Sequence, residues 1–313
     1  MSLSLVLKVI TSHNSLLEPG FFDFHQCSFE NITSSSRGGA FCLSHFESRV
    51  KVTECGFYRC ITTFYTYSAG GFSLMYGSDC FMTKTCFYQC MGQSDTSAFQ
   101  IGCDSKNSNF YCDYGSLTKP FSDPYSTKVN FLIAGTTSLL FTKSNVSKGN
   151  YNSDCFRVSN PKYGIVMTYT VFDSISSPIF FYMYVSTISE ISMNNLVLIN
   201  SETPQFGFFS SSTTVVFNDC FFNTSHQISN PSYINYIGKF VFNNCYIRYQ
   251  PSNTSYLTFN GCKVIDSDSK IGVTYGVNTN DCWNIGIFNN IKPSMAHLSK
   301  NKYLYHLFIV MYV

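Results

Sequence analysis

The chain has 313 residues, of which 12% are charged and 17% are aromatic, and its net charge at neutral pH is +2. Because acidic and basic residues nearly balance and no Lys or Arg cluster occurs, no patch for a polyanion is expected, so nucleic-acid binding is not predicted. The scarcity of charge and the wealth of Ser, Thr and Asn disfavour long amphipathic helices and favour short strands joined by turns.

Residues 1–20 predict an N-terminal strand that caps one end of the fold. From Met1 to Ile10 almost every second residue is a large apolar one, which is typical of a half-buried strand. An export signal is the weaker interpretation, since Lys8 interrupts the apolar run and no small-residue cleavage pattern follows.

A repeat built around cysteine begins at Phe24. Its form is an aromatic or apolar residue, a polar residue, any residue, Cys, any residue and an apolar residue, as in Phe24–Phe29. Its cysteines are Cys27, Cys55, Cys86, Cys220, Cys245 and Cys262. Other residues continue the register at positions 112, 144, 171, 196 and 286, so a unit of about 26 residues recurs about ten times. The step from Cys245 to Cys262 is only 17 residues, which indicates a shortened or misassigned coil.

A second motif recurs in phase with the first. It consists of small residues followed by Phe, in Gly39–Leu43, Gly70–Leu74 and Ser97–Ile101. Units that contain two or three short alternating runs, separated by Asn, Gly, Ser or Pro, are typical of strands with tight corners. A single coil of this kind has no way to bury its inner face, whereas stacked coils enclose a continuous core.

The sequence therefore predicts an all-β fold, a right-handed parallel β-helix of roughly ten coils over residues 21–292, with irregular coils or an insertion at about 115–163. Equal register implies equal azimuth, so Cys27, Cys55 and Cys86 should form one stack and Cys220, Cys245 and Cys262 another. An amide ladder in left-handed backbone is expected at one corner. Its members are Asn194, Asn218, Asn243, Asn260 and Asn284. Glycines 38, 39, 70 and 71 should supply backbone freedom at another corner.

The fourteen cysteines could form seven disulfides, but apolar residues at equivalent positions, Leu196 and Val171, indicate that the site is simply buried. Buried thiols are the favoured interpretation. Disulfides, and metal sites made from pairs such as Cys55 with Cys60, are the alternatives.

The repeat resembles known β-helix families. Residues 27–31 followed by Gly38-Gly39-Ala40-Phe41 look like the repeat of polymorphic outer-membrane-protein β-helices, and Cys55–Cys60 with Cys86–Cys90 is similar to Cys-rich β-helix surface proteins of trichomonads. The resemblance covers residues 24–101 well and 190–290 more loosely. It implies a pectin-lyase-like solenoid that is displayed at a cell surface and is adhesive rather than catalytic.

Candidate catalytic groups are few. The pectin-lyase-like fold also hosts polysaccharide hydrolases and lyases, which need paired carboxylates, and the one close acidic pair in a predicted strand is Asp266 with Asp268. Two solvated acids are the simpler interpretation, and no motif predicts a cofactor or a metal. We therefore expect a non-catalytic scaffold whose partner is a carbohydrate or a cell-surface protein. Candidate contact residues are Tyr58, Tyr65, Tyr67 and Tyr88.

Residues 293–313 form an apolar C-terminal tail. The run from Tyr303 to Val313 has eleven residues, whereas a spanning helix needs about 20, so a terminal strand is expected. A membrane segment that continues in a longer parent protein is the alternative, and it would make the chain an incomplete member of a surface-protein family. Without it, the apolar ends predict poor solubility or end-to-end self-association.

Overall fold

The structure, a computed structural model, describes most of the chain between Ser2 and Asp266. Residues 1 and 267–313 lie outside the described part, as do the internal positions 7–8, 11, 13, 17–18, 46–47, 65–68, 76–78, 93–95, 103–108, 119–128, 135–137, 151–153, 160–163, 178, 185–189, 203–204, 210–212, 225–238 and 251–254.

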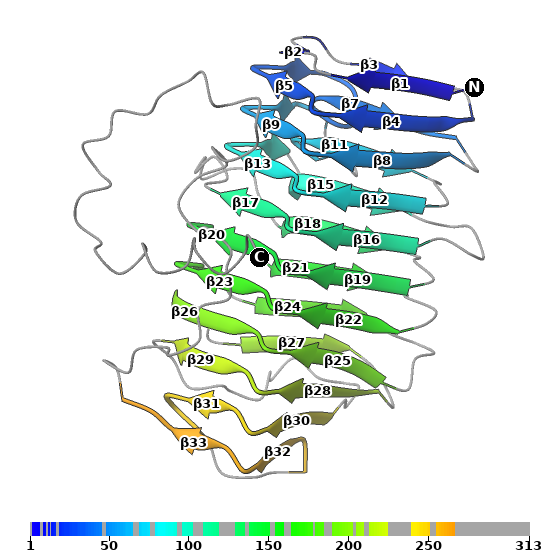
Figure 1. Ribbon diagram of the computed structural model, residues 1–313. Coiled ribbons are helices and arrows are strands. Elements are labelled where there is room, and N and C mark those ends of the chain that lie inside the picture. Colours follow the sequence, from blue (N-terminus) through cyan, green and yellow to red (C-terminus); the bar gives the residue numbers. More distant parts are fainter. Residues whose placement is uncertain are drawn as a thin grey trace, which may run out of the picture.

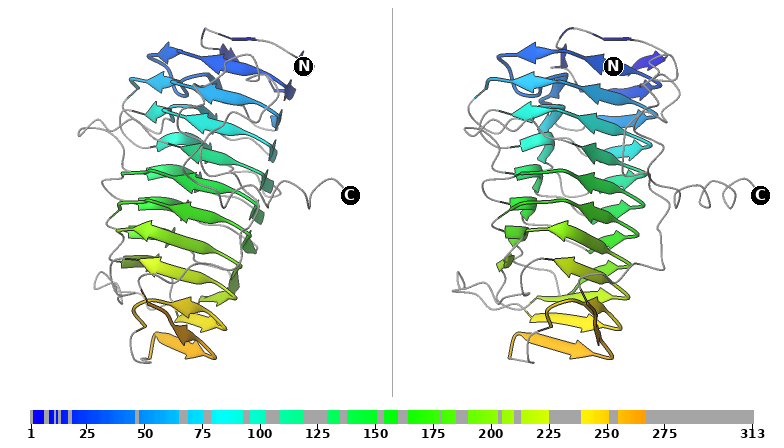
Figure 2. Two further views of the ribbon diagram at one scale, coloured as in Figure 1. Left: turned by 60° about the vertical axis from the view of Figure 1, so that its left-hand side comes forward. Right: turned by 90° about the vertical axis from the view of Figure 1, so that its left-hand side faces the viewer.

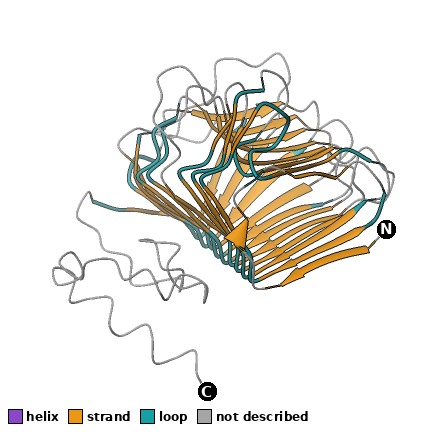
Figure 3. Cartoon of the chain, turned by 90° about the horizontal axis from the view of Figure 1, so that it is seen from above, coloured by secondary structure: helices purple, strands orange, loops and turns teal. Residues whose placement is uncertain are grey.

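The described residues form a parallel β-solenoid, which confirms the predicted all-β class, and they contain no helix. Two sheets of eleven strands, one of eight and one of three run along the stack, and every pairing between their strands is parallel. Figure 1 shows the strands stacked in chain order from β1 at one end to β32 and β33 at the other, and Figure 2 shows the same stack from two other sides. Seen along the stack, the strands form walls around a common interior (Figure 3).

Sheet A is one of the two eleven-stranded sheets. Its strands are β1 (Ser2–Val6), β4 (Phe21–His25), β8 (Arg49–Thr53), β12 (Asp79–Thr83), β16 (Asn109–Asp113), β19 (Ser138–Thr142), β22 (Ile165–Thr168), β25 (Glu190–Asn194), β28 (Thr214–Asn218), β30 (Lys239–Asn243) and β32 (Leu257–Asn260).

Sheet B follows sheet A around each coil. Its strands are β2 (Val9–Ile10), β5 (Ser28–Glu30), β9 (Gly56–Tyr58), β13 (Cys86–Tyr88), β17 (Ser116–Thr118), β20 (Asn145–Ser147), β23 (Val171–Asp173), β26 (Val197–Ser201), β29 (Phe221–Thr224), β31 (Tyr246–Ile247) and β33 (Lys263–Val264).

Sheets C and D complete the coils. Sheet C contains β3 (Asn14–Leu16), β7 (Phe41–Leu43), β11 (Phe72–Met75), β15 (Thr96–Gly102), β18 (Val129–Ala134), β21 (Asp154–Ser159), β24 (Ile179–Tyr184) and β27 (Gln205–Phe209). The short sheet D contains β6 (Thr33–Ser34), β10 (Ile61–Thr62) and β14 (Met91–Gly92).

The register between coils is continuous, including the short step noticed in the sequence. Phe22 pairs with Val50, which pairs with Cys80. Near the C-terminal end of sheet A, Phe242 pairs with Phe259 only 17 positions on, so the coil there is shortened rather than misassigned. The first strands, β1 to β3, pair in register with β4, β5 and β7, and they therefore continue the sheets.

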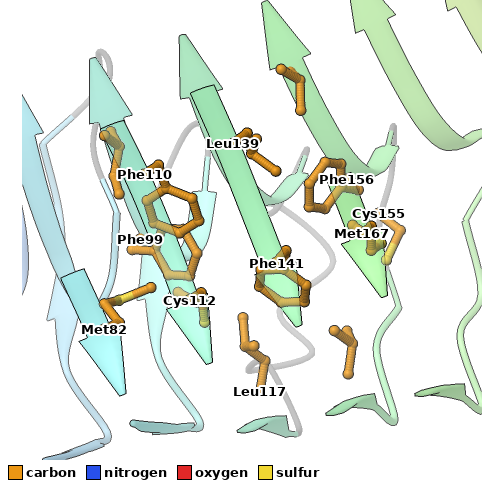
Figure 4. Close-up of a cluster of buried hydrophobic side chains, with 14 of the residues drawn as sticks. Met82, Phe99, Phe110, Cys112, Leu117, Leu139, Phe141, Cys155, Phe156 and Met167 are labelled. Atoms are coloured by element: carbon orange, nitrogen blue, oxygen red, sulfur yellow. The ribbon is translucent and has the colours of Figure 1, made fainter. Parts of the chain in front are cut away.

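The core is a column of stacked side chains. Alternation along the strands turns every second residue inward, and equivalent phenylalanines of successive coils then lie face to face. The rings of Phe29 and Phe57 have centroids 4.7 Å apart, as do those of Phe57 and Phe87. This distance matches the spacing of paired strands. Figure 4 shows part of the core, in which Phe99, Phe110, Phe141 and Phe156 lie among Met, Leu and Cys side chains.

The corner between sheets A and B is made by one residue with positive φ in each coil. These residues are Gln26, Glu54, Lys84, Tyr114, Lys143, Tyr169, Asn195, Asp219, Asn244 and Gly261. The predicted position of the left-handed residue is therefore wrong by one. The strand keeps Asn194 extended, and the next residue, Asn195, turns the chain. Most of the turning residues are not Gly or Asn, so the parallel pairing on both sides must stabilise their strained backbone.

Most of the predicted corner glycines allow neighbouring coils to approach closely, rather than allowing a positive φ. Only Gly38 of the four predicted corner glycines has positive φ, at +74°. A Cβ added at Gly39 would lie 1.9 Å from the Gly70 carbonyl oxygen, and one at Gly71 would lie 2.3 Å from that of Ala98. These positions need Gly because the backbone of the next coil occupies the space.

Candidate binding face

The outer face of sheet A extends over eleven parallel strands. The five-residue strands direct their first, third and fifth residues outward, and the four-residue strands β22 and β32 direct their second and fourth, so three parallel rows run along the stack. Six half-buried or exposed residues of the middle row are apolar or aromatic, namely Phe81, Tyr111, Leu140, Val166, Val216 and Val241. Ser192 interrupts their run, and the row is polar at Lys51 before it and at Thr258 after it. We call the six residues the apolar row.

The row beside the corner is polar, and we call it the amide row. Toward the C-terminal end its members are two threonines followed by four asparagines, namely Thr142, Thr168, Asn194, Asn218, Asn243 and Asn260. Asn218 Nδ2 donates to Asn194 Oδ1 at 2.8 Å, and Asn243 Nδ2 donates to Asn218 Oδ1 at 2.9 Å. Asn260 Nδ2 continues the ladder to Asn243 Oδ1 at 2.9 Å. The structure thus brings together four of the five predicted ladder asparagines, and Asn284 lies outside the described residues.

The third outward row carries charge at its third and fourth strands, after Ser2 and Phe21. Arg49 Nε lies 3.2 Å from Asp79 Oδ2, while Asn109 Nδ2 donates to Asp79 Oδ1 at 3.1 Å. Ser138 Oγ then donates to Asn109 Oδ1 at 2.7 Å. Side chains of four successive coils are therefore held in one chain of hydrogen bonds, which fixes this edge of the face.

The cysteine row lies inside the corner, one residue after the turning residue. Cys27, Cys55, Cys220 and Cys245 are buried there, and Cys262 is half-buried. Cys27 N donates to Cys55 Sγ at 3.3 Å, so these two residues lie on neighbouring coils.

The prediction that Cys86 continues this stack is wrong. Cys86 pairs with Gly56 and therefore lies one position later, so Thr85 takes the place beside Cys55. Both side chains donate to backbone carbonyls in the same way. Cys55 Sγ contacts the carbonyl oxygens of Phe24 and Thr53, and Thr85 Oγ1 contacts those of Val52 and Thr83. The position is filled mainly by small donors, but Gly115 and Leu196 also occupy it, so it does not require cysteine.

Burial raises the pKa of several thiols, whereas a hydrogen bond with the Cys220 thiol lowers the pKa of Cys245. Burial raises the pKa of Cys112 to about 12 and that of Cys42 to about 11. For Cys220, burial and the neighbouring Cys245 thiol raise the pKa well above its ordinary value. Nucleophilic chemistry needs a thiolate, which the raised pKa of Cys112, Cys42 and Cys220 disfavours. Within the described part of the chain, no group of three His, Cys, Asp or Glu side chains could hold a metal ion.

Two of the four predicted contact tyrosines form a stacked pair on the outer face of sheet B. The rings of Tyr58 and Tyr88 are 5.0 Å apart and nearly parallel, and the Arg59 guanidinium lies 5.1 Å from the Tyr58 ring. The Tyr88 ring therefore covers one face of the Tyr58 ring, and Arg59 lies close to that ring. Tyr65 and Tyr67 lie outside the described residues.

The candidate catalytic pair is only partly described. Asp266 is exposed after the last strand of sheet B, whereas Asp268 lies outside the described residues, as does the apolar tail 293–313. None of the described residues belongs to a helix long and apolar enough to cross a membrane.

The sequence reasoning missed the outer face of sheet A. The sequence signal was present, because Leu140, Val166 and Val216 alternate with core residues along their strands, so these strands carry apolar side chains on both faces.

A scan of protein-family models, a search of curated proteins and a search of solved structures each found no match to this chain.

Proposed function

We propose that the protein is a non-catalytic scaffold that binds an extended polysaccharide along the outer face of sheet A. The observation that carries this proposal is the amide row beside the apolar row, on one flat and repetitive surface. A ligand with repeating units suits a surface with a repeating step.

The ladder leaves hydrogen-bonding capacity for a ligand. A carboxamide has two N–H donors and two lone pairs on its oxygen. In Asn218 and Asn243 the ladder uses one donor and one acceptor of each. The remaining groups are held in fixed orientations, so little conformational entropy is lost when sugar hydroxyls bind them. The neighbouring apolar row offers Val216 and Val241 to the apolar face of a sugar ring.

We further propose that the solenoid winds to the right, as pectin-lyase-like β-helices do, because crossovers between parallel strands are almost always right-handed. Display at a cell surface, in an adhesive role, is the cellular setting that fits a binding scaffold of this kind. The disulfide-bonded state of Cys86 supports an oxidising compartment.

The test is binding of the full chain to a panel of soluble linear polysaccharides, measured by calorimetry. Val216→Lys should weaken binding by about tenfold, which is ~1.4 kcal/mol, because it places a charge in the apolar row. Arg59→Ala, on the outer side of sheet B, is the matched control and should leave affinity unchanged. Equal loss in both variants, or no binding by the parent protein, would overturn the proposal. Cleavage of the polymer that disappears in Asp266→Asn or Asp268→Asn would replace it with the enzyme alternative.

A further inference from the structure

Three members of the cysteine row stack on one another near the C-terminal end of the described coils. The register of sheets A and B places Cys245 level with Cys220 on the preceding coil and with Cys262 on the next one. All three carry free thiols. The Cys245 thiol shares a hydrogen bond with each of the other two, so the three sulfur atoms form one row of neighbours.

Exposure changes along this row of thiols. Cys220 and Cys245 are 0% exposed, whereas Cys262 is half-buried. The Cys262 thiol contacts the carbonyl oxygens of Phe242 at 3.3 Å and of Asn260 at 3.7 Å, and the second contact lies in an exposed part of the fold. A reagent in solution therefore reaches the row at Cys262 and meets Cys245 as the next sulfur atom.

The backbone holds Cys245 and Cys262 at a distance that a disulfide can span. Lys263 N donates to the Cys245 carbonyl oxygen at 2.8 Å, so the two coils keep the spacing of paired strands, about 4.8 Å. The Cα atoms of disulfides lie about 4.4–6.8 Å apart, and their Cβ atoms lie about 3.5–4.5 Å apart. An approach of the two Cβ atoms by about 1 Å or less therefore suffices.

The ionisation of the pair gives the two sulfur atoms different roles. A hydrogen bond with Cys220, and a further one with Cys262, lowers the pKa of Cys245, although burial opposes this. Burial raises the pKa of Cys262. Because the thiolate is the nucleophile in thiol chemistry, Cys245 is the better attacking group once Cys262 has been oxidised. The reaction of Cys262 with an oxidant should be the slower step.

We propose that Cys245 and Cys262 form a redox-active pair, which a hydroperoxide converts into a disulfide between neighbouring coils. In the first step the Cys262 thiolate takes one oxygen atom from the hydroperoxide and becomes a sulfenic acid, and the rest of the peroxide leaves as an alcohol or water. In the second step the Cys245 thiolate attacks the Cys262 sulfur, the S–S bond forms, and the S–O bond breaks with loss of water. Two thiols thus lose two electrons and two protons to the hydroperoxide.

The disulfide ties the shortened coil to the coil before it. It closes the step of 17 residues between Cys245 and Cys262, and such a cross-link stabilises a fold mainly by restricting the unfolded chain. In the described part of the chain, β32 and β33 end their sheets and pair on one side only. Local opening of this coil is therefore the motion that the disulfide suppresses.

Another pair of stacked thiols provides an internal comparison. Cys60 and Cys90 lie level on neighbouring coils and share a hydrogen bond. They are 0% and 2% exposed. Because this pair has the same spacing without access to solvent, it should stay reduced under conditions that oxidise Cys245 and Cys262.

Peptide mapping of the full chain tests the pairing. The protein is purified without reductant, treated with hydrogen peroxide under native conditions, and then denatured with an alkylating reagent that blocks the remaining thiols. The expected result is a linked peptide pair that contains Cys245 and Cys262, formed before or during the treatment, while Cys60 and Cys90 are alkylated. Alkylated Cys245 and Cys262 would contradict the proposal, as would a link from Cys245 to Cys220 or an equally fast link between Cys60 and Cys90.

The effect on the coil is tested with Cys262→Ser. The matched control is Cys90→Ser, which removes one thiol of the comparison pair. Peroxide should slow proteolytic cleavage between residues 246 and 266 at least about tenfold in the parent chain and in the control, and a dithiol reductant should restore the original rate. Cys262→Ser should show neither change, and equal slowing in this variant would mean that oxidation elsewhere protects the coil. The mapping uses the parent chain alone, so it decides the pairing even where a variant fails to fold.

Discussion

Single residues at the corners show how closely the coils approach one another. At Gly39 the neighbouring backbone leaves no space for a side chain, since a Cβ would lie 1.9 Å from the Gly70 carbonyl oxygen. At Gly164 a Cβ would meet nothing within 4 Å. A substitution by Ala is therefore expected to destabilise the fold at Gly39 and to be tolerated at Gly164.

We predict that Gly39→Ala lowers the free energy of unfolding by about 3 kcal/mol or more, because the coils must move apart. Gly164→Ala should change it by less than about 0.5 kcal/mol. Urea unfolding followed by circular dichroism measures both. Equal effects of the two substitutions would mean that the coils are not packed as described.

The buried thiols predict a dependence of stability on alkaline pH. The pKa of Cys112 rises from an ordinary value of 9.0 to about 12 because of burial. A raised folded-state pKa stabilises the fold fully below pH 9, and this contribution is lost as pH rises toward 12. We expect the unfolding free energy of Cys112→Ala to fall less steeply than that of the parent chain between pH 9 and 10.5. Parallel slopes would show that Cys112 is not buried as a thiol.

Cys86, which was assigned a wrong register, shows how far the sequence predicts the role of a single residue. Cys86 matched the motif, but the position is defined by burial and by donation to two carbonyls, which Thr85 also satisfies. The spacing indicates the correct alignment of Thr85 with Cys55, because Cys55 and Cys60 are five positions apart, as are Thr85 and Cys90. The turning residues Lys84, Tyr114 and Lys143 carry no local signal, since tertiary pairing rather than propensity sets their positive φ.

Among the elements, the stacked rings connect the core of one coil with that of the next. Phe57 is 1% exposed and lies between Phe29 and Phe87 at 4.7 Å from each. Phe81, on the outer face of sheet A, is 39% exposed.

We predict that Phe57→Ala costs about 3–5 kcal/mol of unfolding free energy, because it leaves a cavity between two rings. Phe81→Ala should cost less than about 1 kcal/mol, since its side chain already meets solvent. Thermal and urea unfolding of both variants provide the comparison. A small loss for Phe57→Ala would contradict a continuous ring stack.

The elements were well predicted wherever two signals coincided. The motif at Phe24–Phe29 and the one at Gly39–Leu43 fall on strands of sheets A, B and C, as their shared period required. The amide ladder followed from spacing alone, because parallel strands in register place equal positions side by side. The disulfide at Cys86 had no such signal, since pairing depends on where the chain folds back rather than on the repeat.

For the whole molecule, the central claim is that successive coils stack in parallel with the stated register. That register makes sheet A a continuous outer face, and it places Val166 directly beside Ser192 on the next coil. Asn194 is two residues further along the same strand, so its Cα lies about 7–8 Å from that of Val166.

Disulfide trapping on this outer face tests the claim most directly. After mild oxidation, the double variant Val166→Cys/Ser192→Cys should yield a linked peptide, because paired positions fall within the Cα range of a disulfide. The offset variant Val166→Cys/Asn194→Cys retains the same native cysteines and should yield little of it. No link in the first variant, or equal links in both, would contradict the stacked parallel register.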